Sequence, residues 1–500
     1  MRLRALATAL LGLLFLAGVA GAAQVSEDTF EDRMAEARSV LLDGLRDHSS
    51  WLRGQKLFLE RKGVLETIIA LDPEDHEAMR ALGWKKSRGG EWAPPKKPKH
   101  LRNYSESALT KAGERYLAAI EPALLMLRDL HADPGLSDPQ RERVEQEILR
   151  VVPDDPDLRA RRGEVRAGTR WVLEETMRAA YQRKKIEELV SHALATLDRP
   201  EPVEAGPREA SLGTWTRVLA TPAGLVFGSV EGEELDEMGM LLQASLDIFQ
   251  KLLDPRAALP QPLTVALLAS PAEAADYLER HPGLSDEDRA RLVETAGTWI
   301  ENDNDIAYWT DRQDARLDGV CRLLQSHLLG SSFHLGIHRP WVHEGFGLYL
   351  TERLVGTRQT WFLPVRDRDG GEKLRTALLE SPEWKRIALE LLDRSETPQL
   401  PALFLAKPEG FASEDLVLSY AFAAFLIEAH GDVVGGVLSD IGAGRRDRAV
   451  IEACLGRDLG QIEERFHRWL REGDEAERGE LQLPDSPGGV GAQASADERR

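Results

Sequence analysis

Cysteine is almost absent from this chain: its 500 residues include only two, Cys321 and Cys454. So few cysteines cannot form the disulfide framework that stabilises many small secreted proteins. Cys321 also lacks the accompanying motif of a cysteine–histidine nucleophile. We therefore expect two buried thiols and no cysteine chemistry.

Aromatic residues and positive charge are also in short supply. Phe, Trp and Tyr make up 6% of the chain. There are 64 Lys and Arg residues and 84 Asp and Glu residues, so the formal net charge is −20. A chain this acidic has no general attraction for nucleic acid or for anionic lipid. Ala, Leu and Arg are abundant instead, which favours helices.

Long apolar runs are missing, with one exception at the N-terminus. There, Arg2 and Arg4 precede an apolar run that ends in the small residues Ala20-Gly21-Ala22. The run is too short for a spanning helix, and no stop-transfer flank follows it. Residues 1–22 are therefore predicted to be a signal peptide of a secreted or periplasmic protein, and no transmembrane segment is expected.

Residues 23–200 have the apolar spacing of helices, as in "EARSVLLDGL" and "KGVLETIIAL", without strand-like alternation. An internal repeat is visible within them. An acidic turn with proline, a short helix, a glycine and a basic segment are followed by Trp92 in one copy and by Trp171 in the other. We expect a helical module of two repeat-like copies, each ending in a small hairpin covered by its tryptophan.

Two stretches rich in proline and charge, residues 93–100 and 198–207, are predicted linkers. The polar, glycine-rich residues 473–500 are predicted to form a disordered tail. A chain of this length is expected to form more than one domain. These boundaries leave residues 205–472 for the second domain.

The pattern changes after residue 205. Short apolar or β-branched runs bounded by Gly, Asn and Asp predict strands at "LVFGSVEG", "PLTVALLAS", "GTWIENDND" and "DIAYWTD". Helices are predicted at "DEMGMLLQASLDIFQKLL" and "RLDGVCRLLQSHLLGSSF", and a helical block follows. The expected fold class is α+β: a mostly helical N-terminal module, then a domain with a small β-sheet, a long helix and a helical C-terminal subdomain.

A Trp-x-x-Glu-Gly turn follows that long helix, in "RPWVHEGFGLYL". Before it come the strand that precedes "SPAEAADYL" and the strand pair that ends in "DIAYWTD"; after it come glycine-punctuated helices from "LVLSYAFAAFLIEAHGD" onward. This order resembles the peptidase MA-like domain of the gluzincin zinc peptidases, as found behind helical repeats in exported bacterial proteins. The resemblance implies a thermolysin-like domain over residues 205–472. In that family a His-Glu-x-x-His helix supplies two zinc ligands and the general base, and a glutamate from the next helix supplies the third ligand.

The resemblance makes Glu344 the third ligand and His327 the second histidine of the motif. Leu323 then stands at the first histidine and Leu324 at the catalytic glutamate. If His327 is instead the first histidine, the motif lacks its glutamate and its second histidine. Leucine neither binds zinc nor transfers a proton, so we expect no catalytic residue and no cofactor, with zinc only in an active domain.

A relocated metal site is the alternative. His334, His338 and His343 lie close to Glu344 in the sequence, and "HLGIH" has the spacing that brings two imidazoles together on a helix. The glycine within this segment and the proline after it favour a connecting loop instead.

The residues therefore predict two kinds of function. The first is a catalytically inactive, metallopeptidase-like protein that binds or scaffolds a peptide or protein, with an extended ligand added along the sheet edge. Trp341, Phe346 and Tyr349 are its candidate binding side chains, and core packing is their alternative role. The second is an active zinc metallopeptidase that uses the non-standard His/Glu site. The sequence does not separate the first function from an interaction protein that works through its helical repeats alone.

Overall fold

The computed structural model describes residues 25–87, 90–95, 107–300 and 303–483. The predicted signal peptide and residues 96–100 of the first predicted linker lie outside these ranges. The chain divides into two compact units, Met1–Arg162 and Gly163–Arg500. Each unit is described by itself.

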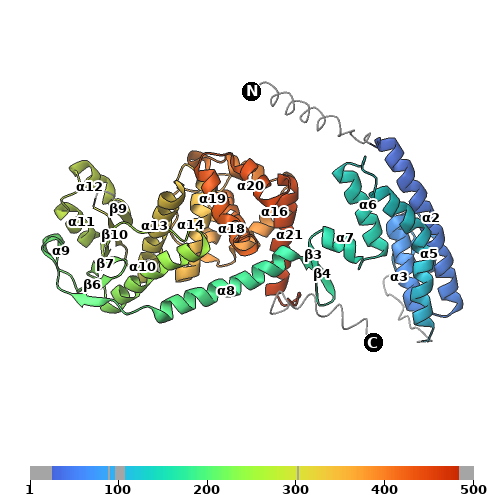
Figure 1. Cartoon of the computed structure of the whole chain (residues 1–500), viewed down its shortest axis with the longest axis horizontal. Coiled ribbons are helices and arrows are strands. Elements are labelled where there is room, and N and C mark those ends of the chain that lie inside the picture. The colour runs from blue at the N-terminus through green and yellow to red at the C-terminus, as the bar shows by residue number, and fades with distance from the viewer. Residues whose placement is uncertain (1–24, 88–89, 96–106, 301–302, 484–500) are drawn as a thin grey trace, which may run out of the picture. The chain divides into compact units, whose positions relative to one another are not determined.

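The first unit is helical apart from one small hairpin (Figure 1). Side chains that accept hydrogen bonds from first-turn amides begin several of its helices, as Ser26, Ser137 and Asp155 do. Gly44 allows close packing of the two longest helices, because a Cβ there would lie 2.1 Å from the carbonyl oxygen of Ala119. The elements are α2 (Glu27–Gly54), α3 (Phe58–Leu71), α4 (His76–Ala81), β1 (Lys85–Lys86), β2 (Trp92–Ala93), α5 (Ser107–His131), α6 (Asp138–Val151) and α7 (Pro156–Arg161).

A hairpin is present at the end of each stretch that the repeat singled out. Strand β1 pairs with β2 at Trp92, and β3 (Glu164–Ala167) pairs with β4 (Arg170–Leu173) at Trp171. The second hairpin and the helix after it, α8 (Glu174–Thr196), belong to the second unit. The domain boundary thus lies near residue 162 and not near 200. The reason is packing: α8 lies against α10 and α18 (Figure 1), and the Glu472 carboxylate accepts hydrogen bonds from Leu173 N and Thr176 Oγ1.

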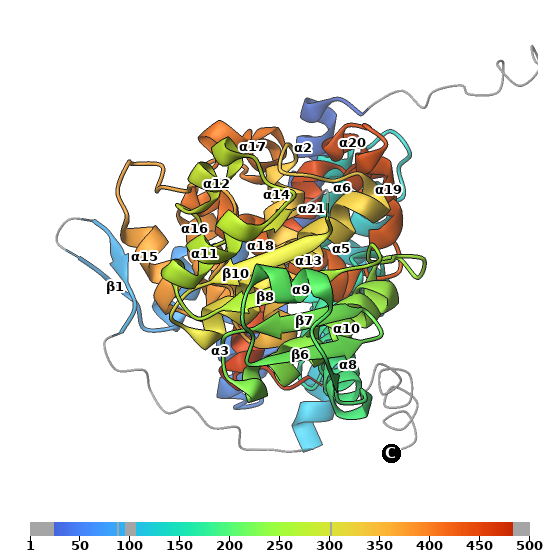
Figure 2. The same cartoon turned by 90° about the vertical axis from the view of Figure 1, so that its left-hand side faces the viewer.

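A six-stranded mixed sheet organises the first part of the second unit (Figure 2). Its order is β5-β6-β7-β8-β10-β9, with β7, β8 and β10 parallel and the other neighbours antiparallel. The strands are β5 (Glu201–Val203), β6 (Arg217–Thr221), β7 (Gly224–Gly228), β8 (Thr264–Leu268), β9 (Gly297–Ile300) and β10 (Asp305–Trp309). All four predicted strands are present. The predicted linker 198–207 is wrong in part, because β5 pairs with β6 and forms one edge of the sheet.

Alternating side chains give the sheet two covered faces. One face, with Val226, Val265 and Ile306, packs on α10 (Gly232–Leu252) and α13 (Gln313–Phe333). The other face packs on shorter helices, which are α9 (Pro207–Leu212), α11 (Pro271–Arg280) and α12 (Asp286–Leu292). Helix α13, predicted as the long helix after the sheet, packs on β10 and β9 of the sheet and also on α10 and α14.

A helical block completes the unit around one central helix, α18 (Ser413–Ala429), whose residues are all buried except Glu414. A helix that is apolar all round needs cover on every side, and α14, α16, α17 and α21 are among the helices that supply it. The block contains α14 (Pro340–Val355), α15 (Lys373–Glu380), α16 (Trp384–Arg394), α17 (Leu400–Leu405), α18, α19 (Val434–Gly442), α20 (Asp447–Leu455) and α21 (Leu459–Glu477).

The predicted α+β class is confirmed, with helices dominating and small sheets between them. The predicted tail begins too early: α21 continues to Glu477, and Leu481 is buried against Val172 and Met177. Residues 484–500 of that tail lie outside the described ranges. Within the described ranges, no helix combines the length and apolar character needed to cross a membrane.

Candidate functional site

The candidate site lies where α13 and α14 pack together beside the edge of the sheet. Tyr308 of β10 fills the space between sheet and helix. Its ring lies over Gly297 of β9 and Gly319 of α13, where an added Cβ would come within 2.1 Å and 2.0 Å of ring atoms. The two glycines thus let α13 and β9 approach the same tyrosine, which brings the predicted active-site helix next to an edge strand.

A buried ion pair joins the two helices at this point. The Arg322 Nη2 atom donates to Glu344 Oε2 and to the carbonyl oxygen of His343, each over 2.8 Å, and both side chains are 0% exposed. Gly347 makes room for the guanidinium, since a Cβ there would lie 2.1 Å from Arg322 Nη1. The Phe362 ring covers it, with its centroid 4.6 Å from the guanidinium carbon. The positive charge beside the predicted third zinc ligand is therefore an arginine of the chain itself.

The second oxygen of Glu344 is also occupied. Its Oε1 atom accepts a hydrogen bond from Phe362 N over 2.9 Å. The segment before Phe362 is bonded to Asp318 of α13. The Asp318 carboxylate accepts hydrogen bonds from Thr357 Oγ1, Gln359 N and Thr360 N. These bonds fix residues 357–362 beside the ion pair. Both carboxylate oxygens of Glu344 therefore have hydrogen-bond partners within the chain.

His343 is buried beside the ion pair and bonded to α13. Its Nε2 atom lies 2.5 Å from Ser326 Oγ. Burial, followed by repulsion from Arg322 and His338, lowers the pKa of His343 to about 3. The imidazole is therefore neutral near pH 7. Its Nδ1 atom is buried without a hydrogen-bond partner in the described residues.

The face of α13 that meets Glu344 differs from the predicted one. Arg322 and Ser326, one helical turn apart, contact residues of α14. The His327 ring instead stacks on Trp299 of β9, with centroids 4.2 Å apart. Leu324, the expected base position, is 0% exposed in the core. Arg322 and Ser326 thus face α14, whereas Leu324 is packed among apolar side chains and Leu323 and His327 are half-buried.

The other candidate ligands are apart from this cluster or already engaged. His334 and His338 are exposed in the connection between α13 and α14, which confirms the predicted loop; His334 ends α13 with a φ of 58°. The described ranges hold no group of three or more His, Cys, Asp or Glu residues arranged for a metal ion. The residues around Glu344 do not fit zinc in this arrangement, because both carboxylate oxygens are bonded to nitrogen donors.

The predicted binding side chains are core residues. Trp341, Phe346 and Tyr349 are 1%, 0% and 0% exposed. Trp341 donates from Nε1 to Asp447 over 2.7 Å, and the Tyr349 hydroxyl donates to Glu428 over 3.1 Å. Their assignment as ligand-binding residues is therefore corrected, since every side of each ring is packed inside the protein.

Both cysteines are free thiols. Cys321 is buried on α13, as expected, and burial raises its pKa to about 12. Cys454 on α20 is only half-buried, so the prediction of two buried thiols holds for one of them.

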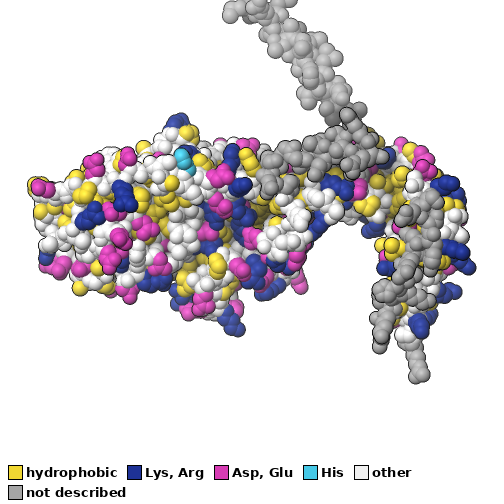
Figure 3. Space-filling model, turned by 90° about the horizontal axis from the view of Figure 1, so that it is seen from below, with side chains coloured by type: hydrophobic (Ala, Val, Ile, Leu, Met, Phe, Trp, Pro, Cys, Tyr) yellow, Lys and Arg dark blue, Asp and Glu magenta, His cyan; other side chains and the backbone are white. Residues whose placement is uncertain are grey.

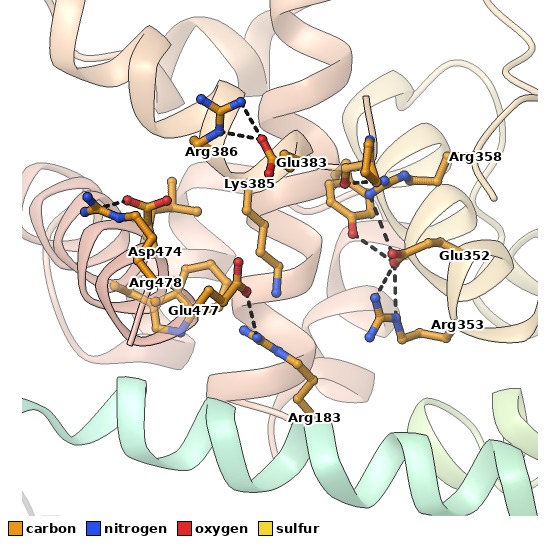
Figure 4. Close-up of a pocket in the computed structure, with 15 residues that line it drawn as sticks. Arg183, Glu352, Arg353, Arg358, Glu383, Lys385, Arg386, Asp474, Glu477 and Arg478 are labelled. Carbon is orange, nitrogen blue, oxygen red and sulfur yellow. Dashed lines mark hydrogen bonds and ion pairs between the residues drawn. The ribbon is translucent and has the colours of Figure 1, made fainter. Parts of the chain in front are cut away.

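A charge-lined cavity of about 560 Å³ lies elsewhere in the second unit (Figure 4). Two of its lining cations, Lys385 and Arg183, donate to the buried Glu428 carboxylate, over 2.8 Å from Lys385 Nζ and over 3.2 Å from Arg183. Burial lowers the pKa of Lys385 to about 8. The other cations on its wall are also engaged: Arg353 with Glu352, Arg386 with Glu383, Arg478 with Asp474, and Arg358 with the carbonyl of Pro382. The network joins α8 to α14, α16 and α18, and every described cation on this wall has a partner.

Charge on the visible face of the molecule in Figure 3 is interspersed, with acidic and basic side chains side by side. The coloured side chains of that face form no continuous positive patch. Comparison with protein-family models, with curated proteins and with solved structures finds no match to this chain.

Sequence reasoning missed the residues that define this site, namely Arg322, Asp318 and Phe362. One signal was available: Arg322 interrupts the apolar run "GVCRLLQ" in a helix predicted to be buried. A charge in such a position is normally paired, and Glu344 was the nearest candidate on the next helix.

Proposed function

We propose that the second unit is a gluzincin-like domain that has lost its metal chemistry and binds extended peptides or protein segments, in an exported protein. The observation that carries the proposal is the buried pair of Arg322 and Glu344. A guanidinium beside the third-ligand glutamate supplies positive charge without a metal. It offers no Lewis acid and no activated water. The order of sheet, α13, α14 with its glutamate, and helical block supports the family resemblance.

The edge strand β9 is the proposed place of binding. It ends the sheet order, and no described strand pairs with its outer side. Such an edge presents unpaired backbone groups that an extended peptide can join as a further strand. Trp299 lies half-buried on β9, stacked on His327 of α13. The stacked rings form a flat apolar surface against which a side chain of the peptide can pack.

The test combines binding, cleavage and metal content. Fluorescein-labelled peptides of about eight residues, rich in β-branched side chains, are titrated with the protein and followed by anisotropy, and mass spectrometry looks for cleavage products. We expect binding without cleavage and without stoichiometric zinc. Trp299→Ala should weaken binding, and alternate N-methylation of the peptide backbone should abolish it, because strand addition requires backbone amides.

Two outcomes would contradict the proposal in different ways. Stoichiometric zinc with peptide hydrolysis would favour the alternative, an active zinc metallopeptidase that uses His343 and Glu344 after rearrangement. Binding that is insensitive to N-methylation and to Trp299→Ala would place the ligand elsewhere in the chain. Trp171→Ala serves as a control, because that tryptophan is also half-exposed and lies on the β3–β4 hairpin.

A further inference from the structure

A smaller cavity of about 240 Å³ lies between α8, the end of α18, α20 and the start of α21. Three arginines line it, together with one histidine and one thiol. Its charged and reactive wall residues are Glu175, Arg178, His430, Cys454, Arg457 and Arg465. The exposed Asp432 stands at its rim. We refer to this cavity as the arginine pocket.

The arginines of this pocket differ in how they are paired. Arg465 donates from Nε to Glu175 over 2.8 Å, and Arg178 lies 3.6 Å from Glu174. Arg457 is half-buried, and no described carboxylate lies within ion-pair distance of it. Burial, together with repulsion from Arg465, lowers its pKa. A half-buried guanidinium next to another one is unfavourable unless an anion neutralises it.

His430 adds an unused hydrogen-bonding atom to the same wall. Its Nε2 atom is buried and has no hydrogen-bond partner in the described residues. A buried polar atom without a partner costs free energy, so it usually meets a water or a ligand. Helix α19 begins nearby at Val434, and no side chain caps its first turn. Its amides add partial positive charge near the rim.

We propose that the arginine pocket binds a small oxyanion, such as a phosphate or carboxylate group, through Arg457 and the ring nitrogen of His430. Arg465 is paired with Glu175 and Arg178 lies near Glu174, which leaves the Arg457 guanidinium for the ligand. The volume suits a compact anion and not a large organic molecule. The 560 Å³ cavity does not offer this, because its cations already have partners. The site is independent of the proposed peptide-binding edge.

Cys454 provides a reporter for the pocket, since its thiol lines the wall and is half-buried. Alkylation by N-ethylmaleimide is followed by mass spectrometry in sodium phosphate, sodium sulfate, sodium acetate or sodium chloride at one ionic strength. We expect phosphate to slow alkylation of Cys454. Protection by acetate as well would identify a carboxylate-type ligand, and protection by phosphate and sulfate alone a tetrahedral oxyanion. Cys321, which is fully buried, reports any general unfolding.

The decisive variant is Arg457→Gln. We expect it to weaken phosphate protection about tenfold or more, because charge-assisted hydrogen bonds are the strong contacts of such a site. The variant should fold, since Arg457 is paired with no acidic residue of the described ranges, and phosphate should no longer raise its melting temperature. Arg394→Gln is the matched control: it removes the same charge from an arginine that is 74% exposed on α16. Protection by chloride equal to that by phosphate, or unchanged protection in Arg457→Gln, would overturn the proposal.

Discussion

At the scale of single residues, the Arg322–Glu344 pair is the feature whose physics is easiest to isolate. Both charges are fully buried, so each depends on the other for compensation. Arg322→Met would leave Glu344 as an uncompensated buried carboxylate. We expect it to lower the free energy of unfolding by about 3–5 kcal/mol, as is usual when one partner of a buried pair is removed. Urea denaturation monitored by circular dichroism measures this loss.

A matched surface pair supplies the control for that prediction. Arg386 and Glu383 are both about half exposed, with side-chain exposures of 50% and 56%. Arg386→Met should cost less than about 1 kcal/mol, because water already screens the pair. The double variant Arg322→Met with Glu344→Gln should recover part of the loss. Equal losses for Arg322→Met and Arg386→Met would show that the buried pair does not need its arginine.

Because of His343, we expect the free energy of unfolding to fall as the pH is lowered. Its folded-state pKa of about 3 lies below the unfolded value of 6.5, so the unfolded chain binds the proton first as the pH falls. Stability from the neutral imidazole is complete above pH 6.5 and is lost progressively toward pH 3. When the pH is lowered from 7 to 5, we expect His343 to reduce the free energy of unfolding by up to about 2 kcal/mol.

The measurement is the free energy of unfolding of wild type and His343→Gln at both pH values. The variant should lose less stability on acidification, because glutamine does not titrate. The exposed His338 gives the control, and His338→Gln should follow wild type. His430, whose pKa burial lowers to about 4, contributes in the same direction and remains in every variant, so the comparison isolates His343. An identical loss in His343→Gln would refute the assignment.

At the scale of elements, the face of α13 toward α14 decides whether a metal site can be built beside Glu344. Arg322 and Ser326 occupy the two positions that approach α14, with Leu323 between them on the half-buried side. Arg322→His, Leu323→Glu and Ser326→His together would place two imidazoles beside Glu344 and a carboxylate at the half-buried position between them. We expect this triple variant to bind about one zinc per chain. Elemental analysis of the purified protein measures it.

A second variant tests the motif positions that the sequence predicted, with Leu323 at the first histidine and Leu324 at the catalytic glutamate. Leu323→His with Leu324→Glu follows that register, and we expect this variant to take up no zinc. Its new carboxylate would replace a fully buried leucine, and Glu344 would keep Arg322 as its partner. Zinc uptake by this variant and none by the triple variant would restore the predicted register.

At the scale of the whole molecule, α8 decides which part of the chain folds by itself. The predicted domain 205–472 omits α8 and the β3–β4 hairpin, although α8 packs on α10 and α18 and supplies Arg183 to Glu428. A fragment of residues 163–483 should melt cooperatively. A fragment of residues 205–472 should be insoluble or molten, because removing α8 exposes the apolar surface beneath it. Thermal melts with limited proteolysis compare the two, and a cooperative melt of the shorter fragment would refute this role of α8.

The sequence by itself determined the local elements of this protein. Four of the six strands of the central sheet were predicted, at "LVFGSVEG", "PLTVALLAS", "GTWIENDND" and "DIAYWTD", and β7 to β10 are found there. Helix α13 and the loop at "HLGIH" were predicted equally well. The physical reason is that apolar periodicity and the backbone limits of glycine and proline act over a few neighbouring residues, so they are visible without the fold.

Only the tertiary structure decided what those elements do together. Trp341 and Tyr349 could be binding or core residues in the sequence, and burial inside the helical block makes them core. The periodicity of α8 is the same whichever unit covers it, so its place in the second unit follows from packing on α10 and α18. Arg322 meets Glu344 because Gly347 leaves room for the guanidinium between two helices. Such contacts depend on the side chains that the fold brings together across long separations, and no local pattern encodes which partner a buried charge will find.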